Sequence, residues 1–109
     1  MKMKTKIALC KMLRLHPQMI GNEITISGNS MVPTLENGEK VKFDSTDKDV
    51  KIGDIILYQQ FSTHLTVHRV VKTIEQNELK YYVTKGDNNP ECDKYLVSSD
   101  RVIGKIIGK

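Results

Sequence analysis

The chain has 109 residues, of which 39% are hydrophobic and 28% are charged. This composition excludes an intrinsically disordered chain, and the length allows one domain with a modest core rather than two. The formal net charge is +4. Because the lysines are scattered and the aromatic content is only 6%, the sequence does not predict a nucleic-acid-binding surface.

The N-terminal segment predicts a short amphipathic helix over residues 3–16, which Pro17 would end. Its apolar positions, with basic residues between them, are Ile7, Leu9, Met12, Leu13 and Leu15. We therefore expect residues 1–21 to form a helix and linker ahead of a domain over 22–109. Residues 1–16 fit either a cap over one end of that domain or a contact with a membrane surface or a membrane-bound partner.

The remainder of the chain reads as short strands separated by turns. Alternating or continuous apolar stretches predict strands at 24–26, 41–43, 55–58, 65–74, 79–83 and 101–107. A polar loop at 86–93 precedes the last of them, and Gln76-Asn77 predicts a hairpin turn. The expected fold class is therefore mainly β: a small antiparallel β-barrel or sandwich with a short N-terminal helix.

Membrane and redox features of the sequence are sparse. There is no run of 18 apolar residues, and the apolar run at 7–10 is too short for a signal-peptide core, so neither is predicted. We expect the chain to be cytoplasmic or peripheral to a membrane. Cys10 and Cys92 lack a Cys-x-x-Cys spacing, which favours two free thiols.

The segment with the clearest chemical meaning is residues 27–35, Ser-Gly-Asn-Ser-Met-Val-Pro-Thr-Leu. Its central Ser30 lies between a glycine-bearing turn and a proline, which favours a fixed, exposed bend. Such a bend suits a nucleophilic hydroxyl, although a serine there also commonly caps a neighbouring amide. A serine nucleophile needs a base, and His68 is a suitable one because imidazole ordinarily titrates near pH 6.5.

Three motifs together resemble the type I signal peptidase superfamily, over roughly residues 22 to 107. They are residues 27–35, the segment His68-Arg69-Val70-Val71, and Lys85-Gly86-Asp87-Asn88-Asn89 followed by Asp93. The resemblance implies that Ser30 is the nucleophile and that His68 occupies the position of the base. Histidine there resembles the endoplasmic-reticulum, archaeal and sporulation-associated branch, whereas other bacterial members use lysine.

The same resemblance assigns the supporting residues. Asp93, six residues after Asp87, is expected to orient His68, while Asp87 is expected to support the loop and is the alternative for the orienting role. The amide N–H of Ser30 is the implied oxyanion donor, and the second donor is either Ser27 or a backbone N–H. The resemblance implies no cofactor.

A metal site is not predicted. His64 and His68 stand four residues apart on an expected strand, about 13 Å, which is too far for both imidazoles to bind one ion.

The resemblance implies a serine endopeptidase that cleaves a signal or leader peptide after small residues. A self-cleaving domain like that of the SOS repressors is a second interpretation. It is opposed by the histidine in place of lysine and by the lack of an Ala-Gly bond before Ser30. A third interpretation is a catalytically inactive module that only binds peptides.

Overall fold

The computed structural model describes residues 22–61 and 64–108. The predicted N-terminal helix lies outside them. The described elements are seven strands and one short 3-10 helix: β1 (Asn22–Thr25), β2 (Lys40–Asp44), β3 (Ile55–Gln60), β4 (His64–Gln76), β5 (Leu79–Lys85), β6 (Val97–Ser98), η2 (Ser99–Arg101) and β7 (Val102–Gly108). This content confirms the mainly β prediction. Within the described ranges, no helix is long and apolar enough to span a membrane.

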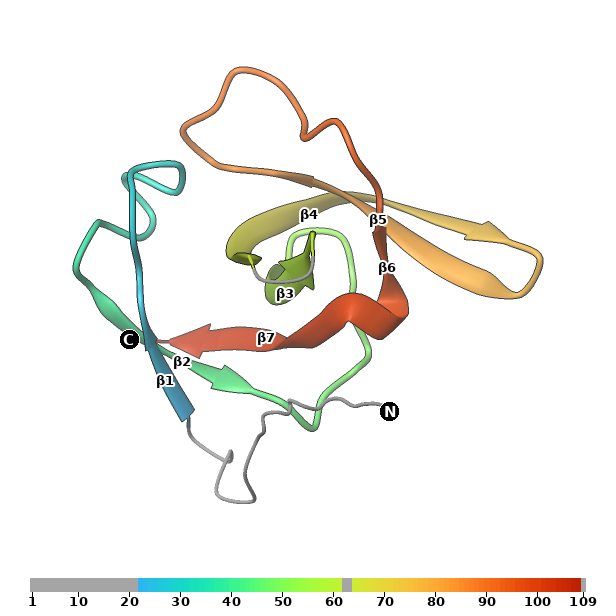
Figure 1. The fold of residues 1–109 in the computed structure, drawn as a ribbon, viewed down its shortest axis with the longest axis horizontal. Coiled ribbons are helices and arrows are strands. Elements are labelled where there is room, and N and C mark those ends of the chain that lie inside the picture. Colours follow the sequence, from blue (N-terminus) through green and yellow to red (C-terminus); the bar gives the residue numbers. More distant parts are fainter. Residues whose placement is uncertain (1–21, 62–63, 109) are drawn as a thin grey trace.

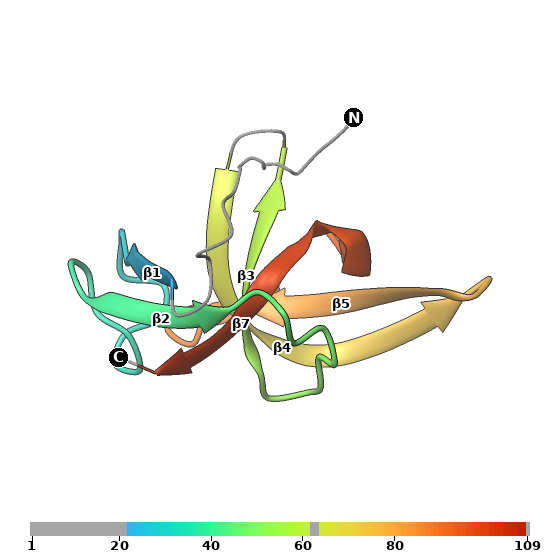
Figure 2. The ribbon, with the colours of Figure 1, turned by 90° about the horizontal axis from the view of Figure 1, so that it is seen from below.

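All seven strands join one antiparallel sheet in the order β1-β2-β7-β3-β4-β5-β6. The sheet is strongly curved, so that β7 crosses between the β1–β2 pair and the β4–β5 hairpin (Figure 1). Seen from below, the β3–β4 and β4–β5 hairpins project in different directions from this crossing (Figure 2). The sequence order of the strands therefore differs from their order in the sheet.

The long strand β4 changes partner in its middle. Its first half, His64–Arg69, pairs with β3, and its second half, Arg69–Gln76, pairs with β5. A register shift between Val70 and Lys72 marks the change. Because such irregularities bend a strand and re-aim its side chains, they place the residues before the bend at the junction of the two hairpins. His68 lies at this junction.

Strand β3 separates two clusters of buried side chains. Ile56 and Tyr58 belong to one cluster, together with Val50, Val70, Tyr82, Val97 and Val102. Ile55, which points to the opposite face, packs against the other, formed by Ile26, Met31, Leu35 and Val41. A continuous apolar run suits a strand that is buried on both faces, so the prediction of a buried strand at 55–58 is confirmed.

The remaining predicted strands occur with ends that differ by a few residues. The β4–β5 turn is formed by Asn77 and Glu78, with φ of 55° and 68° as in a two-residue hairpin of type I′. The prediction of Gln76-Asn77 was one residue early, because Gln76 still pairs with Leu79 in the sheet. The sequence did not predict β6 and η2, which lie just before the last strand. Two residues of strand are too few to produce a period, so the stretch resembles a loop in sequence although Val97 is fully buried.

Candidate active site

Ser30 lies in a turn within residues 26–39, the segment that connects β1 to β2. Gly28 adopts φ of +94°, a conformation that favours glycine, and its N–H donates to Asn37 Oδ1 at 2.8 Å. The next residue, Met31, is only 1% exposed, and its carbonyl accepts the Leu35 N–H at 2.9 Å. The turn is therefore anchored on both sides of Ser30 by backbone bonds and by a buried side chain.

His68 connects Ser30 to a carboxylate. Its Nε2 is 3.1 Å from Ser30 Oγ, and its Nδ1 is 2.6 Å from Asp93 Oδ2. With the ring proton on Nδ1, His68 donates to Asp93 and can accept the hydroxyl proton of Ser30 on Nε2. The His68 side chain is 11% exposed and that of Asp93 is 25% exposed. The structure thus brings three of the predicted site residues into one hydrogen-bonded line.

Asp93 is held in the loop between β5 and β6 by contacts with two buried residues. Its N–H donates to the carbonyl of Thr84 at 2.8 Å. Its Oδ2 accepts the hydroxyl of Thr84 at 2.7 Å and that of Tyr58 at 3.4 Å. Sequence reasoning missed both hydroxyls, because each lies inside an apolar strand pattern and has no motif of its own.

Asp87 points to different partners. Both of its oxygens accept hydrogen bonds from Arg69, at 2.9 and 2.8 Å, and Oδ2 also accepts the Thr34 hydroxyl at 2.6 Å. Arg69 in turn donates to the carbonyl of Gly53 at 2.8 Å. These contacts connect the Ser30 turn to β4, next to His68. The hydrogen bonds from Arg69, above all, lower the pKa of Asp87 from 3.8 to about 2.

Asp87→Asn should reduce stability at neutral pH, by about 1–3 kcal/mol for the charged hydrogen bonds that are lost. The folded-state pKa of Asp87 is below 3.8, so its contribution is full above pH 4 and is lost as the pH falls toward 2. Urea unfolding at pH 7, 4, 3 and 2 measures this. The gap between the wild type and the variant should close at low pH. A constant gap would show that the ionised carboxylate is not the stabilising group.

The loop that carries Asp87 packs directly on the Ser30 turn. The Asn88 N–H donates to the Ser30 carbonyl at 2.8 Å, and the Asp87 N–H lies 3.3 Å from Met31 Sδ. A Cβ on Gly86 would stand 2.7 Å from the Ser30 carbonyl oxygen and 3.0 Å from Ser30 Cβ. The distance from such a Cβ to the carbonyl oxygen of Ser30 is too short for any residue other than glycine. Gly86 is therefore required where the two backbones approach each other.

Gly86→Ala should therefore displace Ser30 without removing any side chain of the hydrogen-bonded line. A misplacement of about 1 Å reduces catalysis by roughly 100-fold. We expect a loss of this order in the rate at which a covalent serine probe labels Ser30, together with a folded circular dichroism spectrum. Labelling at the wild-type rate would mean that the 86–89 loop moves aside and leaves Ser30 in place.

Ser27 is exposed in the segment that leads from β1 to Ser30. Among the described residues, no hydrogen bond joins it to Ser30, His68 or Asp93. Its assignment as a second oxyanion donor stays a prediction, as does that of the Ser30 N–H.

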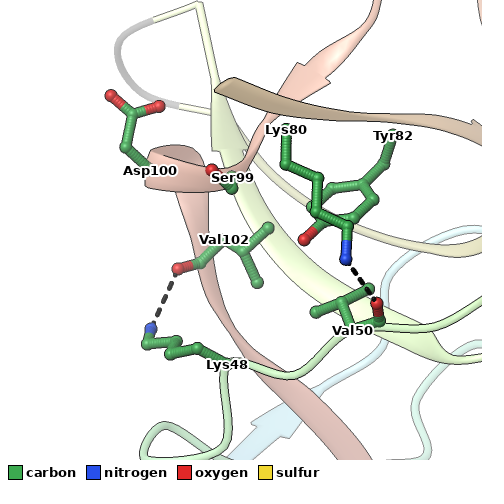
Figure 3. Close-up of a pocket in the computed structure, with 7 residues that line it drawn as sticks. All are labelled: Lys48, Val50, Lys80, Tyr82, Ser99, Asp100 and Val102. Atoms are coloured by element: carbon green, nitrogen blue, oxygen red, sulfur yellow. Dashed lines mark hydrogen bonds between the residues drawn. The ribbon is translucent and has the colours of Figure 1, made fainter. Parts of the chain in front are cut away.

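A separate pocket of about 520 Å³ lies between β5, η2, β7 and the segment before β3 (Figure 3). Its lining residues are Lys48, Val50, Lys80, Tyr82, Ser99, Asp100 and Val102. Lys48 Nζ donates to the carbonyl of Val102 at 3.1 Å, and Lys80 Nζ donates to that of Val50 at 3.5 Å. None of Ser30, His68 and Asp93 lines this pocket, so it is not part of the hydrogen-bonded line.

Comparisons with known proteins match the part of the chain that carries these motifs. The sequence profile of the family described as Peptidase S24-like matches residues 12–107. The signal peptidase complex catalytic subunit SEC11 of Scheffersomyces stipitis is 27% identical over 92 residues, which cover 76% of this chain and 55% of that protein. The SEC11 subunit of Candida tropicalis is 28% identical over 94 residues, covering 78% and 57%.

A bacterial relative is similar to the same extent. Signal peptidase I W of Bacillus subtilis is 30% identical over 86 residues, covering 77% of this chain and 45% of that protein. The chain therefore spans about half the length of the relatives it matches. These matches confirm the resemblance to the signal peptidase superfamily that the motifs predicted.

Proposed function

This chain belongs to the Peptidase S24-like family, and we propose that it is a serine endopeptidase that cleaves a signal or leader peptide. Ser30 is the nucleophile, His68 is the general base, and Asp93 orients and stabilises His68. The observation that carries this proposal is the line Ser30 Oγ–His68 Nε2 at 3.1 Å and His68 Nδ1–Asp93 Oδ2 at 2.6 Å. In a peptidase family, this order of hydroxyl, imidazole and carboxylate suits acyl transfer.

The chemistry proceeds in two halves. Ser30 Oγ attacks the carbonyl carbon of the scissile bond while its proton passes to His68 Nε2. The resulting imidazolium protonates the leaving amine, which departs and leaves an acyl ester on Ser30. A water molecule then loses a proton to His68, attacks the ester, and releases the second product with return of the proton to Ser30. Asp93 stays ionised and stabilises the imidazolium in each half.

The oxyanion of each tetrahedral intermediate needs hydrogen-bond donors. We assign the first to the N–H of Ser30 and keep Ser27 as the candidate for a second. The anchored turn supports this assignment, because Met31 and the bonds to Gly28 and Asn88 restrain the backbone around Ser30. Donors held in place before the reaction need no reorganisation when the negative charge develops.

The names of the relatives, which are signal peptidases, support the proposed substrate class. We propose that the peptide binds as an extended strand on the edge of β1, which ends the sheet and leads directly to Ser30. Because alternate side chains of such a strand point the same way, we expect small residues to be selected at two alternate positions before the cut. The matched relatives favour neither self-cleavage nor an inactive module.

We also propose that residues 1–16 contact a membrane surface or a membrane-bound partner. The support is their basic amphipathic pattern, with Lys2, Lys4, Lys6, Lys11 and Arg14 among apolar positions. Anionic lipid attracts such a segment, and its apolar positions provide the contact with the bilayer. This contact is separate from the chemistry at Ser30, which uses residues of the described domain.

A library of leader peptides tests the proposed activity. The protein is incubated with the library, and the cut sites are identified by mass spectrometry. We expect cleavage after an Ala-x-Ala-like sequence, with small residues at the last and third-last positions before the cut. Scattered cuts without such a preference would contradict the substrate class, and no cuts by a protein that reacts with a serine probe would point to a different peptide.

A further inference from the structure

Among the residues the structure describes, Thr84 is the one buried side chain that is neither apolar nor aromatic. It stands near the end of β5 and pairs with Val70 of β4. A buried hydroxyl costs free energy unless it is hydrogen-bonded, whereas valine has almost the same shape and would carry no such cost. The buried hydroxyl of Thr84 therefore needs a hydrogen-bond partner.

That partner is Asp93, which Thr84 contacts twice. The Thr84 carbonyl accepts the Asp93 N–H at 2.8 Å, and the Thr84 hydroxyl donates to Asp93 Oδ2 at 2.7 Å. The first bond positions the backbone of Asp93, and any residue at position 84 can make it. The second bond acts on the carboxylate and requires a hydroxyl. The two contributions can therefore be separated by substitution.

Tyr58 supplies a second hydroxyl from β3, which is separated from β5 in the sheet by β4. Its OH is 3.4 Å from Asp93 Oδ2 and 3.3 Å from Thr84 Oγ1, and the side chain is 1% exposed. Burial is the main cause that raises the pKa of Tyr58 to about 12. Tyr58 thus remains protonated, and remains a donor, throughout the neutral range. Its bonds are longer than that of Thr84, so its effect on Asp93 is the smaller one.

We propose that Thr84 is the positioning residue of Asp93 and that Tyr58 assists it. The inference rests on the proposed function, since it assigns how Asp93 is kept ready to orient His68. The carboxylate oxygen that faces His68 Nδ1 also receives the two hydroxyls. Hydrogen bonds to that oxygen restrain rotation of the carboxylate. Without them, Asp93 would remain in the loop but would no longer present a fixed acceptor to His68.

Substitutions at position 84 separate the hydroxyl from packing. Thr84→Ser and Thr84→Ala both remove the methyl group and differ only in the hydroxyl, so they form a matched pair. Thr84→Val keeps the shape and removes the hydroxyl, and Tyr58→Phe removes the second donor. All are made in the full chain, and thermal unfolding records which variants are folded at the assay temperature.

Two readouts do not depend on a peptide substrate. One is the rate at which a fluorophosphonate probe labels Ser30. The other is the low-field proton resonance of His68 Nδ1–H, identified by its loss in His68→Ala. We expect Thr84→Ala and Thr84→Val to slow labelling roughly 10- to 100-fold, the range for a lost hydrogen bond to a charged group. We expect both to shift or broaden the resonance as well. Thr84→Ser should stay near the wild type, and Tyr58→Phe should show a smaller change.

For a peptide that the enzyme cleaves, kcat should fall with the labelling rate while KM stays nearly constant, because Thr84 does not contact the substrate. Equal labelling and equal resonances in the folded Ser and Ala variants would overturn the proposal. A wild-type protein without the low-field resonance would overturn it too. Failure to cleave any leader peptide, with probe labelling and the Ser–Ala difference intact, would contradict the proposed substrate and not the role of Thr84.

Discussion

Replacing Ser30 by alanine is expected to abolish peptide cleavage, with a rate reduced by several orders of magnitude, while the fold is retained. The reason is that Ser30 Oγ is the only oxygen in the hydrogen-bonded line that can form the acyl ester. The turn itself is held by Met31 and by the backbone of Ser30, which alanine preserves. Cleavage kinetics with the best library peptide measure the loss, and circular dichroism with thermal unfolding records the fold.

Ser99→Ala is the matched control for this experiment. Ser99 is exposed on η2 and lies in the lining of the separate pocket. Its removal should leave both cleavage and probe labelling unchanged. Full activity of Ser30→Ala would remove the proposed mechanism altogether, whatever the state of the control.

Replacing His68 by alanine is expected to have an effect of similar size. In the wild type, the cleavage rate should fall on the acid side of its pH profile, where an imidazole becomes protonated and can no longer accept the Ser30 proton. In His68→Ala, this acid limb should disappear together with nearly all turnover. Asp93→Asn should cost less, since the carboxylate orients and stabilises His68 but does not transfer the proton.

His64→Ala is the control, because His64 is an exposed histidine on the same strand. The variant should keep both the wild-type rate and the wild-type acid limb. If His68→Ala instead kept the wild-type pH profile, the base would be another residue, with Lys85 and Lys72 the next candidates. The assignment to the histidine branch would then be wrong.

The local sequence determined several features of the structure. Alternation of apolar residues and the position of turn residues predicted the strands at 41–43, 55–58 and 65–74, which the structure confirms within a few residues. The Asn77 turn was predictable because a two-residue hairpin has its own residue preferences. The motif around Ser30 likewise predicted an exposed bend, and the structure has a turn there in which Ser30 is partly buried. These features depend on backbone preferences within a few residues, which a single sequence expresses directly.

The sequence did not determine that the site residues come together, because they are far apart in the chain. Ser30 and His68 are separated by 38 residues, and His68 and Asp93 by 25. Residue types and a family resemblance suggested these roles, and the sequence left Asp87 as an alternative for the orienting acid. In the structure, Asp87 bonds to Arg69 and Thr34 while Asp93 bonds to His68.

What the sequence by itself determined was where the longer strands form and which residue types are available for acid–base chemistry. Only the tertiary structure decided which side chains meet. It placed His68 where β4 changes partner and Gly86 against the Ser30 carbonyl. It also placed the buried Thr84 within hydrogen-bond distance of Asp93. The physical reason is that these contacts depend on strand order and register in a curved sheet. Both are set by pairings between segments distant in sequence, and no local pattern of residues encodes them.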